Sequence, residues 1–158
     1  MKVGLISDTH GYFNPVIREI FQDVELILHA GDIGSEEIIR ELEKIAPIKA
    51  VYGNTDYYPL THYFTADEHV TVFGKQIWLT HYFNEYRSRD RRRFSKITRP
   101  DFIIHGHTHS HEMREFEKVQ IINPGTAAKG GRHESPYVAI IEIFPNSTPS
   151  KVEFVCLR

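Results

Sequence analysis

The sequence predicts an α/β fold: a four-layer α-β-β-α sandwich of two mixed sheets packed face to face, with flanking helices. Three observations predict it. The first part of the chain alternates short apolar runs with amphipathic helical patterns, which is typical of parallel strands joined by right-handed crossover helices. The middle has a hairpin pattern, and the last part has four short strand patterns without helices between them. Residues 1–158 are long enough to bury such a core as a single domain.

The first half of the predicted fold is strand–helix–strand–helix–strand. Residues 2–7 form a continuous apolar run, which is typical of a strand buried on both faces. Asn14 and Pro15 predict a helix N-terminus, with the helix running to about Gln22. A strand over 25–29, a helix from Ser35 to about Ile45 and a strand over 48–52 follow. The second helix should bury one face, because its apolar residues recur at helical spacing: Ile38, Ile39, Leu42 and Ile45.

The second half of the chain changes character. Strand patterns over 69–73 and 76–81 flank Gly74 and Lys75, which predict a tight hairpin turn. A helix is predicted over 85–97, with an apolar stripe formed by Tyr86, Phe94 and Ile97. The remaining predicted strands, the last four of them antiparallel, cover 101–105, 112–116, 119–122, 137–144 and 151–155.

The composition is that of an ordinary globular domain and argues against several classes of protein. Hydrophobic residues make up 41% of the chain, and a net charge of −2 gives no overall attraction to nucleic acid or anionic membranes. The only cysteine, Cys156, excludes a disulfide framework and a thiolate metal cluster. The sequence also has no signal-peptide pattern and no apolar run of membrane-spanning length, so we expect a cytoplasmic protein without a membrane partner.

Polar motifs follow the apolar runs, at the points where the predicted strands end. In chain order they are Asp8-Thr9-His10, Gly31-Asp32, Gly53-Asn54, His81 and Gly106-His107-Thr108-His109. Ligands of open α/β sheets bind at the carboxyl ends of the strands, so these turns should converge on one rim. Two aspartates, an asparagine and four histidines at one rim predict a site for two divalent metal ions.

The spacing and chemistry of these residues suit a dinuclear centre. Asp8 and His10 lie two residues apart, so both can point to one side of an extended backbone, and the 106–109 motif repeats that spacing. Asp32 can offer one oxygen to each cation, while Asn54 adds a neutral oxygen. Because imidazoles and carboxylates are mixed, we expect Mn²⁺, with Fe²⁺, Ni²⁺ or Zn²⁺ as alternatives, rather than Ca²⁺ or Mg²⁺. Two cations about 3.5–4 Å apart hold a phosphate and lower the pKa of a shared water toward roughly 7.

In these residues the chain resembles the calcineurin-like metallophosphoesterase superfamily, whose signature is D-x-H, G-D, G-N, a single H and G-H-x-H. One Asp-x-His is common by chance, but five pieces in the family's order are specific. The length and the stretches 53–56 and 123–126 are similar to those of small bacterial and archaeal phosphodiesterases. The resemblance implies one metal ion on Asp8, His10, Asp32 and His109, and another on Asp32, Asn54, His81 and His107, with Asp32 bridging. It also implies catalytic roles for Asp32, Asn54 and His81.

The chain departs from the family pattern at two positions. Larger members carry a histidine after the G-N pair, where it assists the leaving group; Thr55 stands here, so no histidine general acid is predicted at this position. The single histidine is usually followed by glycine, and here it is followed by Tyr82, whose phenol we expect at the rim of a substrate pocket. Asp56 is expected to orient a histidine from behind the metal ligands.

A basic segment follows the single histidine. Residues 87–99 contain seven arginines and lysines and one acid, Asp90. A solvated helix face is the simpler interpretation, and the alternative is an electropositive wall that attracts phosphate-bearing substrates. Arg87, together with Thr55 and Tyr82, is our candidate for substrate contact.

Three other histidines are predicted to lie outside the site. His105 and His111 share the two-residue spacing of the 106–109 motif, but they are more simply interpreted as a core residue at a strand end and an exposed loop residue. His29 is expected to pack beneath the Asp32 turn.

The sequence therefore predicts a metal-dependent phosphodiesterase that hydrolyses a small phosphoester with a hydroxide bridging two metal ions. Two enzyme alternatives are a broad phosphomonoesterase and a nuclease, although a nucleic-acid partner is not favoured. A third alternative is a non-catalytic scaffold similar to the retromer subunit of this fold, which has lost key metal-site histidines. The complete set of predicted ligands argues against the scaffold, and a homo-oligomer stays open.

Overall fold

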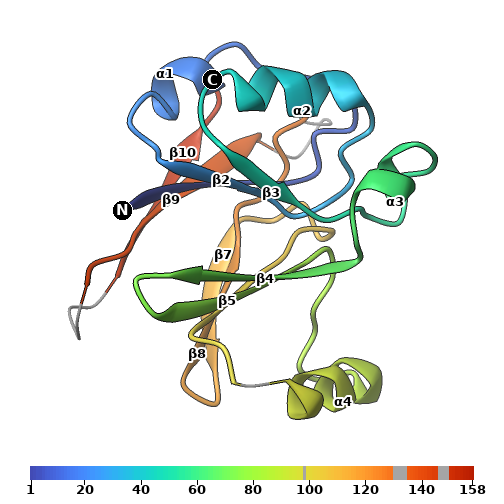
Figure 1. The fold of residues 1–158 in the computed structure, drawn as a ribbon, viewed down its shortest axis with the longest axis vertical. Helices are drawn as coiled ribbons and strands as arrows, with labels where there is room; N and C mark the ends of the chain where they lie inside the picture. The colour runs from blue at the N-terminus through green and yellow to red at the C-terminus, as the bar shows by residue number, and fades with distance from the viewer. Residues whose placement is uncertain (98, 130–134, 146–149) are drawn as a thin grey trace.

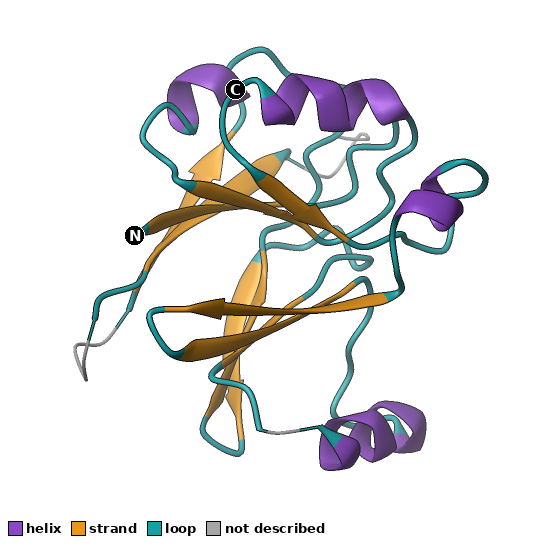
Figure 2. Ribbon diagram, viewed as in Figure 1, coloured by secondary structure: helices purple, strands orange, loops and turns teal. Residues whose placement is uncertain are grey.

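The computed structural model describes residues 1–97, 99–129, 135–145 and 150–158. Two five-stranded mixed sheets face each other, with α1 and α2 on the outer side of one sheet and α4 on the outer side of the other (Figure 1). Figure 2 shows the same layering by element type, with strands between outer helices. The predicted α-β-β-α sandwich is confirmed.

The first sheet has the strand order β10-β9-β1-β2-β3. Its parallel part consists of β1 (Lys2–Ile6), β2 (Leu26–His29) and β3 (Ile48–Ala50). β9 (Tyr137–Glu142) and β10 (Lys151–Cys156) add antiparallel neighbours at one side. Since Ile6 is paired with His29, β1 and β2 end at the same level, and the loops that follow them leave the sheet side by side.

The second sheet has the order β4-β5-β6-β8-β7. Its strands are β4 (Asp67–Val72), β5 (Lys75–Thr80), β6 (Phe102–Ile104), β7 (Glu112–Phe116) and β8 (Val119–Asn123). β8 is antiparallel to β7, as predicted for the last four strands, but it also pairs parallel with β6. The turn of the β4–β5 hairpin is Phe73-Gly74, one residue earlier than predicted. Both turn residues have positive φ, as a two-residue turn that matches strand twist requires.

The helices are shorter than the sequence pattern predicts. They are α1 (Ile17–Ile20), α2 (Glu36–Glu43), α3 (Leu60–Tyr63) and α4 (Ser88–Lys96), of which α3 was not predicted. The helix begins later than predicted, with Val16 rather than Asn14 as its N-cap, although Asn14 accepts a hydrogen bond from the Val16 amide. It stops after one turn, where Phe21 enters the core. The predicted apolar stripe of the basic helix is wrong at Tyr86, which is 88% exposed. The chain before α4 is a loop instead, because Glu85 turns inward to pair with Arg114.

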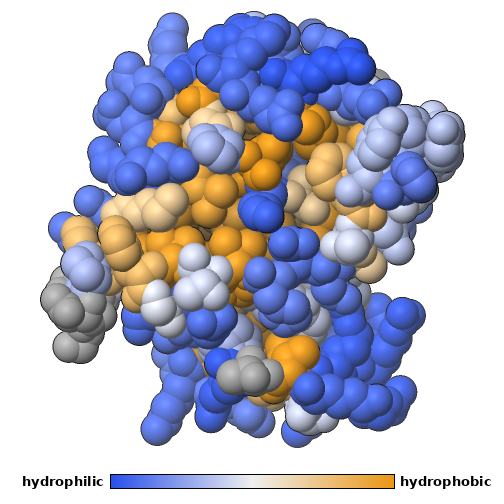
Figure 3. All heavy atoms as spheres, viewed as in Figure 1, coloured by the Kyte–Doolittle hydropathy of each residue, from blue (hydrophilic) through white to orange (hydrophobic). Residues whose placement is uncertain are grey.

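Three apolar layers hold the sandwich together. The central one, between the sheets, contains Leu5, Leu28, Leu79 and Ile104. A second packs α1 and α2 on the first sheet through Phe21, Ile38 and Leu42, which confirms the predicted buried face of α2. A third packs Trp78 and Phe83 of the second sheet and its loop against Phe94 of α4. In Figure 3 the helices present a polar surface above and below, and apolar side chains gather between them on this face.

In the part of the chain that the structure describes, no helix is long and apolar enough to cross a membrane.

Candidate metal centre

The parallel strands of both sheets end at one rim, and the residues that follow them meet there. The chain places Asp8 and His10 after β1, Asp32 after β2, Asn54 after β3, His81 after β5, and His107 and His109 after β6. Backbone hydrogen bonds join neighbouring loops within each sheet: the Asp8 amide donates to Gly31 (3.0 Å), and the Gly106 amide donates to His81 (3.0 Å). The fold thus brings residues up to a hundred positions apart into one cluster.

Five of the seven predicted ligands have backbone angles in the left-handed region. Their φ values are 53° at Asp8, 47° at His10, 53° at Asp32, 70° at His107 and 62° at His109. Residues with a Cβ adopt this region rarely, at a cost of about 1–3 kcal/mol each, and such strain concentrates at functional sites. The strained angles turn each side chain sharply out of its strand and into the rim.

Two glycines let the loops approach each other closely enough to form the cluster. A Cβ on Gly53 would lie 2.1 Å from Oδ1 of Asp32, and a Cβ on Gly106 would lie 1.8 Å from Oγ of Ser7. Neither contact is sterically allowed. The glycines of the G-N and G-H-x-H motifs are therefore required by the packing of neighbouring loops.

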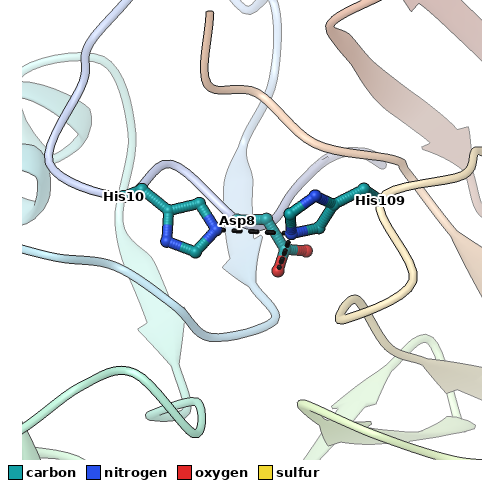
Figure 4. A group of neighbouring side chains, drawn as sticks. All are labelled: Asp8, His10 and His109. Atoms are coloured by element: carbon teal, nitrogen blue, oxygen red, sulfur yellow. Dashed lines mark hydrogen bonds and ion pairs between the residues drawn. The ribbon is translucent and has the colours of Figure 1, made fainter. Parts of the chain in front are cut away.

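Asp8, His10 and His109 form the first group of ligand atoms. Figure 4 shows the two imidazoles pointing toward each other beside the carboxylate, with Nε2 of His10 and Nε2 of His109 separated by 3.3 Å. Nε2 of His109 lies 3.4 Å from Oδ1 of Asp8. The three donor atoms lie within 4.8 Å of one another, which is the spacing expected around a single cation.

Asp8 is buried and only half satisfied. Its Oδ2 accepts hydrogen bonds from the Ser7 hydroxyl (2.6 Å) and the His107 amide (3.0 Å), whereas its Oδ1 has no hydrogen-bond partner. Burial raises the pKa of Asp8 above its usual value, although the Ser7 hydrogen bond and the charges of His81 and His109 oppose the rise. A buried carboxylate oxygen without a partner is costly, and a cation at this position would remove the cost.

Asp32, Asn54, His81 and His107 form the second group. Oδ1 of Asn54 lies 2.9 Å from Nε2 of His81 and 2.8 Å from Nδ1 of His107, and Oδ2 of Asp32 lies 3.5 Å from Nε2 of His81. Nδ1 of His81 donates to the Ala30 carbonyl at 2.7 Å, so in the neutral ring Nε2 is the nitrogen that could bind a cation. Metal-binding histidines are commonly oriented by such a bond to a carbonyl.

Asp32 lies between the two groups. Its Oδ1 accepts the Thr55 amide hydrogen at 2.9 Å, while its Oδ2 faces His10 at 3.9 Å and His81 at 3.5 Å. Burial raises the pKa of Asp32, but hydrogen bonds from His81 and the Thr55 amide overcome this and hold the pKa below its usual range. Asp32 is therefore ionised at neutral pH, with one oxygen directed at both histidines.

The donor set fits a pair of divalent cations. Imidazole nitrogens, carboxylate oxygens and an amide oxygen face one another at distances where only a proton or a cation relieves their repulsion. Burial lowers the pKa of His81. Its hydrogen bond to Asp32 and the charge of Asp8 raise the pKa by more than burial lowers it, so the net shift is upward. A proton and a metal ion therefore compete for the same nitrogen.

Asp56 supports the rim in a different way from the one predicted. Its carboxylate accepts hydrogen bonds from the backbone amides of Ile33 (3.0 Å), Gly34 (2.8 Å) and Gly53 (2.9 Å), rather than from a histidine. Asp56 thereby joins the loop after β2 to the loop after β3. The prediction that it orients a histidine is wrong, because its two oxygens are used by these amides.

Sequence reasoning missed the supporting role of Ser7, which positions the Asp8 carboxylate. The only signal was a hydroxyl residue directly before the Asp-x-His motif. The 123–126 segment also contacts the site: Thr126 donates to the Asp8 carbonyl (2.9 Å), and Asn123 donates to the Gly106 carbonyl (3.0 Å). These bonds anchor the 123–126 segment against the rim.

The candidate substrate residues lie at one side of the cluster. The Tyr82 ring meets the His107 ring edge-on, with centroids 4.7 Å apart, and the Arg87 guanidinium lies 5.0 Å above the Tyr82 ring. Thr55 is exposed next to Asn54. All three residues therefore border the predicted ligands.

The three histidines that were predicted to lie outside the site do so: His29, His105 and His111. His29 is fully buried beneath the Asp32 turn, where Nδ1 accepts the Gly31 amide hydrogen and Nε2 donates to Thr9. His105 is buried, and desolvation with the nearby Arg114 charge lowers its pKa to about 4. His111 is exposed and stacks on Tyr137 with centroids 3.9 Å apart.

The two-sheet sandwich, with acidic and histidine side chains gathered at the strand ends, defines a phosphoesterase fold with a candidate metal centre. The profile of the calcineurin-like phosphoesterase superfamily domain matches residues 1–145, and the chain belongs to this superfamily.

Relatives agree with this assignment. The chain is 33% identical over 153 residues to a probable metallophosphoesterase of Methanothermobacter thermautotrophicus, covering 90% of this chain and 86% of that protein. It is 33% identical over 142 residues to a phosphodiesterase of Methanocaldococcus jannaschii, covering 79% and 83%.

Solved structures share the fold. An archaeal phosphodiesterase superposes with a TM-score of 0.78 at 29% identity over 99% of both chains. A Zn²⁺ complex of Vps29 from Entamoeba histolytica superposes with a TM-score of 0.75 at 21% identity over 100% of both chains. At that identity, the likeness to Vps29 shows the fold alone.

Proposed function

We propose that this protein is a divalent-metal-dependent phosphodiesterase of small phosphoesters. The single observation that carries the proposal is the convergence at one rim of the seven donor side chains, which approach one another closely enough to share cations. Membership of the phosphoesterase superfamily and the name of the Methanocaldococcus relative support it.

In this proposal Asp8, His10, Asp32 and His109 hold one cation, and Asp32, Asn54, His81 and His107 hold the other. Mn²⁺ is the first choice, with Fe²⁺, Ni²⁺ and Zn²⁺ as alternatives. When bound, such a pair supplies a hydroxide nucleophile at neutral pH and neutralises charge on the phosphate oxygens. Hydrolysis adds water across one P–O bond and releases an alcohol and a phosphomonoester.

The side chains around the site then have separate roles. Asp32, ionised and held by the Thr55 amide, contributes to both groups of donor atoms and fixes their position relative to each other. Asn54 presents its amide oxygen from the loop after β3 of the first sheet, and His81 presents a ring nitrogen from the second sheet, where the Ala30 carbonyl keeps it in one orientation. Tyr82 and Arg87 border the space beside the cluster and orient the substrate, while Thr55 lines the entrance. A cytoplasmic location and a homo-oligomer remain predictions from the sequence.

The proposal is tested by stripping the protein with a chelator and restoring Mn²⁺, Fe²⁺, Ni²⁺ or Zn²⁺ separately. We expect hydrolysis of bis(p-nitrophenyl) phosphate to disappear on stripping and to return with the metal, faster than hydrolysis of p-nitrophenyl phosphate. Equal rates on both esters would favour a broad phosphomonoesterase. Undiminished activity in the stripped protein would exclude the metal-dependent mechanism, and no activity with any metal would favour the scaffold.

A further inference from the structure

A pocket of about 300 Å³ opens beside the candidate metal centre. It shares Asn54 and His81 with the cluster, and its far lining comes from the start of α4, including Arg87 and Arg89. Its volume is at the lower end of the range for small-molecule sites and greatly exceeds that of one phosphate group. The pocket therefore has room for a part of the substrate that does not react.

The arginines of this pocket differ in whether their charges are paired with carboxylates of the fold. Arg93 donates to Asp67, Asp90 and Thr80 and lies over the Trp78 ring, so its charge is already neutralised within the structure. Its role is to fasten α4 to the second sheet.

Arg87 and Arg89 are not neutralised in this way. Both are exposed, and the guanidinium of Arg87 lies over the Tyr82 ring and forms no ion pair with a carboxylate of the residues that the structure describes. Within the described part of the chain, Arg89 has no hydrogen-bond, ion-pair or ring partner. Two unneutralised guanidiniums that line a pocket next to a phosphate site are suited to a second anion, because arginine binds phosphate through paired N–H donors.

We propose that Arg87 and Arg89 form a subsite for a second phosphate, and that the substrate is a small phosphodiester with one ester arm ending in a phosphomonoester. This inference rests on the proposed phosphodiesterase function and specifies its substrate class. The reacting phosphate lies at the cluster, the arm occupies the pocket along Tyr82, and the terminal phosphate reaches the two arginines. The limited volume of the pocket, about 300 Å³, favours a small molecule over a nucleic-acid strand.

The test uses two p-nitrophenyl phosphodiesters with the same butyl arm, one ending in a hydroxyl and the other in a phosphate. With the restored metal, we expect kcat/KM to favour the phosphate-ended ester by roughly 10-fold or more, as expected for charge-assisted hydrogen bonds. The double variant Arg87→Glu/Arg89→Glu should lose this preference. Arg91→Glu/Arg92→Glu is the matched control, because it makes the same charge change on exposed residues of α4 that do not line the pocket. The control should keep the preference.

Equal kcat/KM for the two esters in the wild type, or an equal loss in both double variants, would overturn the subsite. A preference that grows with the length of an oligonucleotide substrate would also overturn it, in favour of a nucleic-acid groove. Binding separates this inference from the proposed function. In an NMR titration of the metal-free protein with 4-hydroxybutyl phosphate, the Nε–H signals of Arg87 and Arg89 should shift and those of Arg91 and Arg92 should not. Such shifts without hydrolysis of either ester would support the anion subsite while the phosphodiesterase function fails, and unshifted signals would overturn the subsite.

Discussion

The hydroxyl of Ser7 donates a 2.6 Å hydrogen bond to Oδ2 of Asp8, while Oδ1 of the same carboxylate faces Nε2 of His109 at 3.4 Å. Together with the His107 amide, which donates to the same Oδ2, this contact fixes which oxygen of a fully buried carboxylate faces the histidines. The left-handed backbone at Asp8 and the close approach of Gly106 to Ser7 help to hold the carboxylate in this orientation. Ser7 is thus a positioning residue for the first group of donor atoms.

Ser7→Ala should weaken metal binding by about 10–100-fold, the usual effect of removing a group that orients a ligand. The physical reason is that Oδ2 of Asp8 loses the Ser7 donor and keeps the His107 amide, so the carboxylate is held less firmly. Metal titration followed by calorimetry measures the effect. Ser35→Ala is the control, since Ser35 makes no side-chain capping hydrogen bond at α2. Unchanged affinity in Ser7→Ala, with unfolding of the metal-free protein also unchanged, would show that Ser7 has no positioning role.

Asp32→Ala should abolish turnover and reduce binding of both cations, because Oδ2 of Asp32 faces histidines of both groups. His111→Ala should retain most activity, since His111 is exposed and stacked on Tyr137 outside the cluster. His105→Gln should also remain active, provided that the buried position tolerates the change. Metal content and kcat of the purified variants check this. A His111 variant as inactive as the Asp32 variant would mean that the ligand assignment is wrong.

Stability should depend on pH through His29. Burial lowers the pKa of His29 to about 3, with the charge of His81 adding to the effect. The unfolded chain binds a proton at this ring below pH 6.5 and the folded chain does not, so stability falls as pH decreases from about 6.5 toward 3. Between pH 7 and 5, the unfolding free energy of the wild type should therefore fall by about 2 kcal/mol more than that of His29→Gln, which lacks the imidazole. Urea unfolding in the presence of chelator measures the difference. Equal losses in both proteins would show that His29 titrates normally when folded.

Hydrolysis should slow steeply as the leaving-group pKa rises, because Thr55 is too weak an acid to protonate an alkoxide. General-acid catalysis is typically worth about 10²–10⁴-fold. Thr55→His should recover less than this, since both oxygens of Asp56 already accept backbone amides and are not free to orient a new imidazole. The slope of log kcat against leaving-group pKa, over a series of aryl and alkyl diesters, measures the effect. A flat slope in the wild type would point to another acid, or to a slow step other than bond cleavage.

The sequence alone determined the fold class and the identities of the residues that meet at the rim. Both depend on local patterns: apolar runs of strand length, a helical repeat in α2, and polar motifs directly after strands. Since parallel strands place their carboxyl ends at one edge, the positions of Asp8, Asp32 and His81 directly after strands predict that these side chains lie close together.

The tertiary structure decided what depends on partners distant in the chain. Two of the three amides that donate to Asp56 come from the loop after β2, more than 20 residues away. The burial of Glu85 against Arg114 moves the start of α4 and leaves Tyr86 in solvent. Which arginines are neutralised is likewise a matter of three-dimensional neighbours: Arg93 meets Asp67 and Asp90, whereas Arg89, four residues before it, meets neither. Periodicity specifies which face of an element is apolar, but only packing specifies which charge meets which.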